Sequence, residues 1–178
     1  LSDKELSSKK LPMPMLLCVG AINTFLINKK LRGYVSINVQ SGEALDTHSF
    51  ATLIGVGATT VNPYLAFDSL YQRHEKKLFS QFNFDECVER YIKSVNAGLL
   101  KIMSKMGISV LSSYRGGCNF ETVGLSRTIV DDYFPGVVSK ISGIGLVGIE
   151  KKIRQIHKQA FESTETVLPI GGIYRYRK

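Results

Sequence analysis

Short β-branched segments alternate with helical segments along the first half of the chain, and this alternation constrains the fold more than any other feature. Apolar residues 15–31 follow two prolines and end in a basic turn, which predicts a helix. Residues 34–39 alternate in polarity and predict a strand. A helix over 48–54, a strand over 58–61 and a helix over 64–74 follow. Strands that alternate with helices predict an α/β fold of parallel strand–helix units, in an open or barrel-like sheet.

The second half of the chain opens with its most regular helical pattern. Apolar residues recur at spacings of three and four over 86–106, which predicts a long amphipathic helix that ends at Gly107. The segments expected after it are a strand over 108–111, short helices over 119–123 and 126–133, and a longer helix over 146–161.

Length and composition bound the class of protein. The 178 residues suit one domain or part of a larger one, and the 44% hydrophobic and 21% charged fractions are those of a globular chain. No apolar run reaches the ~18 residues of a membrane span, and the first residues lack the pattern of a signal peptide. A cytoplasmic location is therefore expected. Cys18, Cys87 and Cys118 are far apart and odd in number, so they predict buried thiols.

The positive charge is concentrated in the second half of the chain. The net charge is +8; residues 1–100 carry 11 basic and 9 acidic groups, and residues 101–178 carry 12 and 6. A basic half can bind nucleic acid. Here the lysine pairs are scattered, and the one dense cluster is the tail at Arg175, Arg177 and Lys178. The pattern does not indicate a nucleic-acid interface.

A glycine-rich segment precedes the last predicted helix. Residues 143–148 match G-x-G-x-x-G, a loop that can place a phosphate on helical N–H groups, which makes Gly143 and Gly145 candidate cofactor-binding residues. The full dinucleotide fingerprint needs a buried strand before the loop. Residues 136–142 have little strand character. The segment is therefore expected to be a structural turn and helix start.

A second candidate lies in the turn over 112–117, at the carboxyl end of a predicted parallel strand. Ligands bind at that end of the strands in α/β folds. Ser113, Arg115 and Gly116 could hold an anion there. The alternative is an ordinary turn in which Arg115 pairs with a carboxylate such as Glu121.

Several short motifs, taken together and in order, resemble the glutamate synthases. The matches extend over nearly the whole chain. They are KIMSKMGIS at 101–109, SYRG at 113–116, FE at 120–121, GLS at 124–126, YF at 133–134 and GIGL at 143–146; upstream, GEA at 42–44, His48, FA at 50–51, Gly55, GA at 57–58 and VNPYLA at 61–66; and LSD at 1–3 and GG at 171–172 near the two ends.

The resemblance implies a position within the large (alpha) subunit of such an enzyme. It places residues 1–170 in the second half of the non-catalytic central domain, and residues 171–178 in a linker toward the FMN-binding domain. The implied fold is a half-domain similar to part of a TIM barrel. In the family this domain separates the glutaminase and synthase sites and forms part of the wall of the ammonia tunnel.

The resemblance carries over no catalytic, cofactor-binding or metal-binding residue. The family makes glutamate from glutamine and 2-oxoglutarate, and its full-length members use FMN, an iron–sulfur cluster and NAD(P)H or ferredoxin. The glutaminase cysteine, the FMN segment and the iron–sulfur cysteines fall outside this sequence. We therefore expect a chain that is inactive alone, is completed by the remaining glutaminase and FMN-binding domains, and self-associates in isolation.

Two alternatives from other classes remain open at this point. One is a small stand-alone α/β protein that binds a flavin or a phosphate at 113–117 or 143–148. The other is a basic scaffold whose tail contacts nucleic acid.

Overall fold

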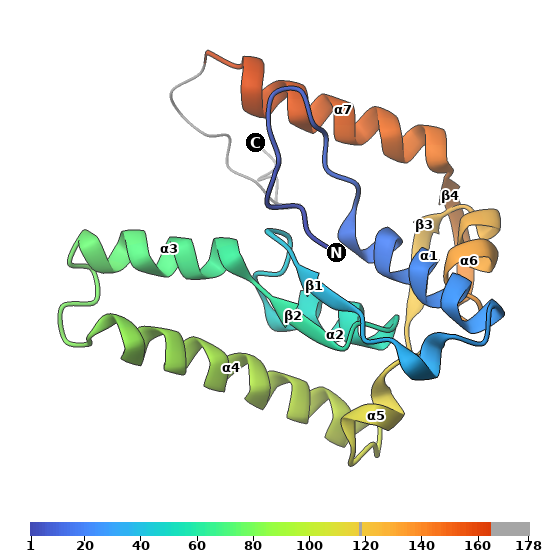
Figure 1. Cartoon of the computed structure of the whole chain (residues 1–178), viewed down its shortest axis with the longest axis horizontal. Helices are drawn as coiled ribbons and strands as arrows, with labels where there is room; N and C mark the ends of the chain where they lie inside the picture. Colours follow the sequence, from blue (N-terminus) through green and yellow to red (C-terminus); the bar gives the residue numbers. More distant parts are fainter. Residues whose placement is uncertain (118, 165–178) are drawn as a thin grey trace, which may run out of the picture.

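The protein is an α/β chain in which helices flank two separate parallel strand pairs (Figure 1). The computed structural model describes residues 1–117 and 119–164. The parallel strand pairing predicted from the first half of the sequence is confirmed. The elements are α1 (Met15–Asn28), the 3-10 turn η1 (Arg32–Tyr34), β1 (Asn38–Gln40), α2 (Thr47–Gly55), β2 (Thr60–Asn62), α3 (Tyr64–Glu75), α4 (Phe84–Lys105), α5 (Leu111–Tyr114), β3 (Glu121–Leu125), α6 (Arg127–Tyr133), β4 (Val138–Ile144) and α7 (Leu146–Glu162).

The first sheet pairs β1 with β2 and is bordered by the amino-terminal residues. Val39 of β1 lies opposite Val61 of β2. On the other side of β1, the amide of Gln40 donates to the carbonyl of Leu1 at 2.9 Å, and the amide of Asp3 donates to the carbonyl of Gln40 at 3.2 Å. The amino-terminal residues therefore run parallel to β1 and cover its outer edge.

Three apolar clusters form the core. The first joins α1, β1, α2 and α4 around Val19 and Val39, which are 0% and 2% exposed. The second lies between α2, α4 and α5 and contains the buried ring of Tyr114. The third packs Ile129 and Val130 of α6 against Leu16 and Leu17 of α1 and other apolar neighbours. The core is thus divided between the two sheets rather than centred on one.

Three segments of the second half differ from the sequence prediction. Residues 108–111 are not a strand, and α5 begins at Leu111. Burial of Tyr114, whose hydroxyl donates to the carbonyl of Ala51 at 3.2 Å, is a tertiary contact that local propensity does not encode. Residues 119–123 are not a helix but lie mostly in β3, and residues 136–142 lie largely in β4.

Pairing between β3 and β4 explains the last two differences. Leu125 lies opposite Ile144, and the register shifts twice along the pair. Neither strand contains a buried residue, and β4 is largely exposed, so both lack the buried apolar pattern by which sequence identifies a parallel strand.

The long helices α3 and α4 form a hairpin that projects away from the two sheets (Figure 1). Phe67 of α3 and Tyr91 of α4 meet edge to face, with ring centroids 5.9 Å apart. None of the described helices combines the length and the apolar character needed to cross a membrane.

Candidate functional site

The glycine-rich segment does stand between a strand and a helix, because β4 is followed directly by α7 with Gly145 as the N-cap residue. A Cβ atom on Gly143 would lie 2.1 Å from the carbonyl oxygen of Gly124 in the neighbouring strand. A Cβ atom on Gly148 would lie 2.9 Å from the Cβ of Ile144. Two of the three glycines are thus required by contacts within the chain itself. These contacts account for Gly143 and Gly148 without a bound phosphate.

The Ser113–Gly116 candidate is also explained by packing. The amide of Gly116 donates to the carbonyl of Gly55 at 2.9 Å, which fixes the loop against the carboxyl end of α2. Ser113 is exposed. Gly116 lines a pocket of about 70 Å³, far below the 300–1,000 Å³ typical of a ligand site.

Arg115 does not pair with Glu121, the partner that the alternative interpretation of this turn named. Glu121 instead pairs with Lys140 at 2.9 Å, and Arg115 makes no ion pair with any residue that the structure describes. A second guanidinium, that of Arg32, is held by the carbonyl of Gly57 at 2.7 Å. Burial lowers the pKa of Arg32, and the charge of Arg115 lowers it further. Both arginines therefore lie near the carboxyl end of α2, where the helix dipole favours cations.

A cluster of polar groups that the sequence did not single out lies at the carboxyl end of the first sheet. Asp3 accepts hydrogen bonds from the hydroxyl of Ser41 at 2.7 Å and from the amide of Gly42 at 3.1 Å. Glu43 accepts a bond from the amide of Met15 at 3.0 Å and so caps α1, whose N-cap residue has no side-chain hydrogen bond. The short polar turn after a strand was a signal for this cluster. Because each carboxylate has internal donors, the cluster fixes loops rather than presenting a ligand site.

Partial burial changes the acidity of two groups near this cluster. Desolvation raises the pKa of Glu43, although the residue as a whole is exposed, and the bond from Met15 opposes that shift. Burial also raises the pKa of the Cys18 thiol, and the negative charge of Glu43 adds to the effect. A thiol with a raised pKa is a poor nucleophile at neutral pH. The pair has the character of a structural site.

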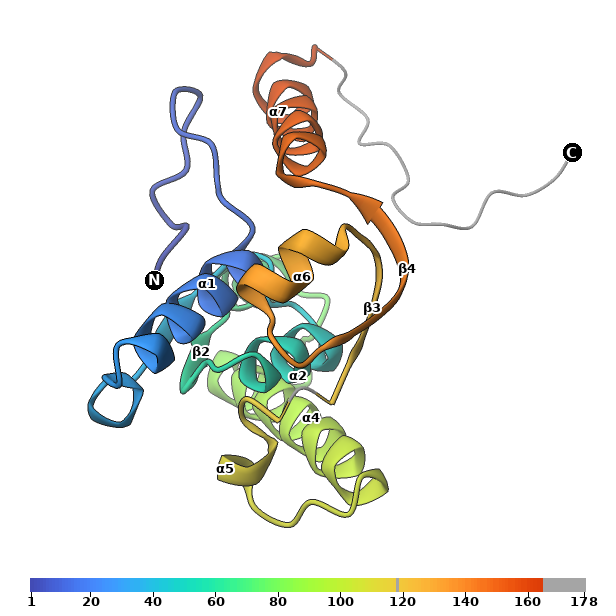
Figure 2. The same cartoon turned by 90° about the vertical axis from the view of Figure 1, so that its right-hand side faces the viewer.

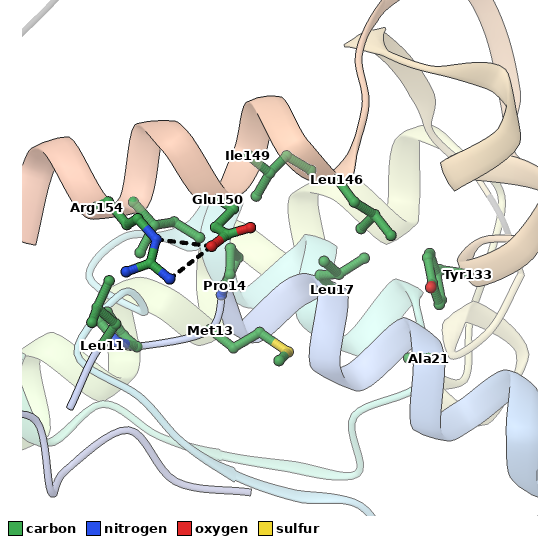
Figure 3. A pocket seen from close by; sticks show the side chains of 12 residues that line it. Leu11, Met13, Pro14, Leu17, Ala21, Tyr133, Leu146, Ile149, Glu150 and Arg154 are labelled. Atoms are coloured by element: carbon green, nitrogen blue, oxygen red, sulfur yellow. Dashed lines mark hydrogen bonds and ion pairs between the residues drawn. The ribbon is translucent and has the colours of Figure 1, made fainter.

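A large cavity lies elsewhere, between α1, α6 and α7 (Figure 3). We call it the groove; its volume is about 580 Å³ and its walls are mainly apolar. Arg154 and Glu150, which both line the groove, form an ion pair with a distance of 2.8 Å (Figure 3). The lining residues are Leu11, Pro12, Met13, Pro14, Leu17, Ala21, Tyr133, Leu146, Ile149, Glu150, Ile153 and Arg154.

The structure does not bring the sequence candidates together. None of Ser113, Arg115, Gly116, Gly143 or Gly145 lines the groove. Among residues 1–117 and 119–164, no group of three or more histidine, cysteine or acidic side chains could hold a metal ion. The groups described above take part in packing contacts and capped turns.

Comparison with known proteins gives a consistent result. The sequence model of the glutamate synthase central domain matches residues 1–126. A glutamate synthase (NADPH) large chain from Azospirillum brasilense is 51% identical over 178 residues, 100% of this chain and 12% of that protein. The corresponding large chain of Bacillus subtilis is 42% identical over 179 residues, 99% of this chain and 12% of that protein.

A relative with a different electron donor in its name matches equally far. The ferredoxin-dependent glutamate synthase of Pyropia yezoensis is 43% identical over 191 residues, 99% of this chain and 12% of that protein. This chain thus spans about 12% of the length of these relatives. The family resemblance noted in the sequence is confirmed, and the chain belongs to the glutamate synthase central-domain family.

Proposed function

We propose that this chain serves as a structural segment of a glutamate synthase large subunit and catalyses no reaction alone. The observation that carries the proposal is the 51% identity over all 178 residues, which corresponds to only 12% of the matched large chain. The overall reaction assigned to the parent enzyme is formation of glutamate from glutamine and 2-oxoglutarate. In that setting, FMN, an iron–sulfur cluster and NAD(P)H or ferredoxin are used by the full-length enzyme, outside this segment.

The proposed role is to space the glutaminase and synthase sites and to form part of the tunnel that carries ammonia between them. Residues 1–170 would be the second half of the central domain, part of a barrel-like arrangement, and residues 171–178 would lead toward the FMN-binding domain. The exposed parallel pair β3–β4 supports this role, because parallel sheets are normally covered on both faces. The linker lies outside the described residues.

A segment exchange tests this proposal. The matching 178 residues of the Azospirillum brasilense large chain are replaced by this sequence, and the chimaera is compared with the unaltered protein and with a chimaera carrying a scrambled segment. We expect the exchanged protein to fold, retain bound flavin and form glutamate from glutamine. The scrambled segment should abolish folding.

Measuring the two half-reactions separately distinguishes a structural role of the segment from a role in the ammonia tunnel. Glutamine hydrolysis and ammonia-dependent glutamate formation are measured separately from the coupled reaction. A folded exchange chimaera in which both half-reactions survive but glutamine-derived ammonia escapes would contradict a working tunnel wall. Failure of the exchange chimaera to fold would contradict the structural role itself.

A further inference from the structure

Helix α7 is amphipathic but buries none of its residues. Leu146, Ile149 and Ile153 recur at spacings of three and four along one face. Ile156 is 58% exposed and Phe161 is 45% exposed, whereas the α6 residue Val130 is 1% exposed. An amphipathic helix normally owes its stability to burial of this face. Helix α7 therefore stands apart from the surface that its sequence suits.

The surface beneath α7 is the groove. Leu17 and Ala21 of α1 lie on one side, and Ile149 of α7 lies on the other (Figure 3). Ile153 of α7 also lines the groove. Ile149 also packs against the third core cluster, which anchors the beginning of the helix. The two walls are apolar, so their approach would remove apolar surface from water.

Residues 4–14, here called the strap, lie at the edge of the groove, whereas residues 1–3 stay paired with β1. Leu11, Pro12 and Met13 line it. Farther back along the strap, the carbonyl oxygen of Ser7 lies 2.8 Å from Nε2 of His157, in the second half of α7. The strap rises beside α7 in both views (Figure 1, Figure 2). Its contacts thus reach both the groove and the far half of the helix.

Two glycines precede α7, and they differ in how much space surrounds the position of a Cβ atom. Gly143 is fixed by its contact with Gly124. A Cβ on Gly145 would meet nothing closer than Oγ of Ser126 at 4.0 Å. Gly145, directly before the helix, is therefore not fixed by such a contact, and as a glycine it can adopt backbone conformations that other residues rarely adopt.

We propose that the strap is a wedge that holds α7 away from α1, and that α7 pivots at Gly145 and closes the groove when the strap leaves. The closed state buries Ile149 and Ile153 against Leu17 and Ala21. The Ser7–His157 contact and the Leu11–Met13 segment together set the open state. Motion of the strap and motion of α7 are then coupled. This inference does not depend on the proposed role in glutamate synthesis.

A single tryptophan tests the wedge, because the chain contains no tryptophan of its own. The reporter Ile153→Trp is placed in the groove, with the strap either intact or weakened by Leu11→Ser together with His157→Ala. On weakening the strap, the emission should shift to shorter wavelength and acrylamide quenching should fall. No shift, or a shift to longer wavelength with stronger quenching, would overturn the wedge.

Gln155→Trp is the matched control, because Gln155 is exposed on the opposite face of α7. That reporter should stay accessible to acrylamide with either strap. Leu11→Ser and His157→Ala are also tested singly, which keeps the experiment informative should the double variant fail to fold. Each single change should give a smaller shift in the same direction, and absence of a shift in both contradicts the proposal.

Discussion

Asp46 begins α2 with a single carboxylate oxygen that accepts two hydrogen bonds. Oδ1 lies 2.8 Å from the amide of Ser49 and 2.6 Å from its hydroxyl, and these bonds lower the pKa of Asp46. Asp46→Ala should reduce the free energy of unfolding by about 1 kcal/mol near neutral pH, the usual cost of losing an N-cap. Urea unfolding followed by circular dichroism measures the difference.

The pH dependence of that difference has a fixed sign. Because the pKa of Asp46 is lower in the folded than in the unfolded chain, its contribution is present above the ordinary aspartate range and is lost as pH falls through the folded pKa. The gap to Asp46→Ala should therefore narrow in acid. Asp46→Asn is the control. Its side chain is neutral at every pH, so its difference in unfolding free energy from Asp46→Ala should not change with pH. A gap that stays constant down to pH 2 would contradict the role of the charge.

Glu43 should show the opposite sign. Desolvation raises the pKa of Glu43 in the folded chain. The contribution of Glu43 to the free energy of unfolding is therefore largest below the ordinary glutamate pKa, and it is lost as pH rises through the pKa of the folded chain. The amide oxygen of Glu43→Gln can still accept from Met15. This variant should be at least as stable as the parent at pH 7, with no advantage at pH 4, in thermal unfolding. Lower stability of the variant at pH 7 would show that the charge is needed for the cap.

At the scale of elements, the crossing of α1 and α6 depends on a missing side chain. A Cβ on Gly20 would lie 2.4 Å from the ring of Phe134 and 2.6 Å from the backbone oxygen of Tyr133. Because backbone cannot yield as a flexible side chain does, Gly20→Ala should destabilise the chain by about 1–3 kcal/mol, the usual cost of overpacking.

Gly33→Ala is the matched control for that crossing. Nothing lies within 4 Å of its Cβ position, and its φ is not in the left-handed region. This variant should be neutral or slightly stabilising, because alanine restricts the unfolded chain. Equal effects of the two substitutions in chemical unfolding would refute the close approach of α1 and α6.

Helices were predictable where residues within or next to the helix, such as prolines or polar caps, mark its start. The two prolines before Met15 mark a helix start that the structure confirms, and the helices predicted over 48–54 and 126–133 are present as α2 and α6. Helix α4 begins at Phe84, before the predicted start at residue 86, because Asn83 and Glu86 form a capping box there. The strands β3 and β4 were missed because their pairing with each other, rather than a buried apolar pattern, defines them.

The candidate sites were predictable only as sequence patterns. Residues 143–148 have the spacing of a phosphate loop, but the contact of Gly143 with Gly124 comes from strand pairing that the spacing does not reveal. A pair between Arg115 and Glu121 was one of two interpretations of the turn, and Glu121 instead pairs with Lys140 in the neighbouring strand. Asp3 and Ser41 are far apart in sequence, so their hydrogen bond was not predictable.

At the scale of the whole molecule, apolar side chains gather on the β3–β4 pair and the start of α7. Val123 is 65% exposed, Ile141 opposite it is 61% exposed, and Val147 is 80% exposed. We expect the isolated 19.8 kDa chain to self-associate, since contiguous exposed apolar surface promotes association. Size-exclusion chromatography with light scattering at several concentrations measures the mass.

Threonine substitutions on the strand pair separate this surface from general misfolding. Val123→Thr with Ile141→Thr should shift the chain toward the monomer while keeping its circular dichroism spectrum, because threonine suits strands and lowers apolar exposure. Leu78→Thr, on the tip of the α3–α4 hairpin, should leave the association unchanged. A monomeric parent with one cooperative unfolding transition would contradict the expected association.

The division of the core into clusters also sets an order in time. Every residue of the first cluster, with the neighbours that pack on it, lies between Met15 and Leu99. The third cluster needs residues as late as Ile149 to meet Leu16 and Leu17 near the start. During synthesis, which proceeds at roughly 5–20 residues per second, the first cluster can consolidate while the later residues are still being added. The face of α1 that packs against α6 would then remain exposed to solvent for several seconds during synthesis.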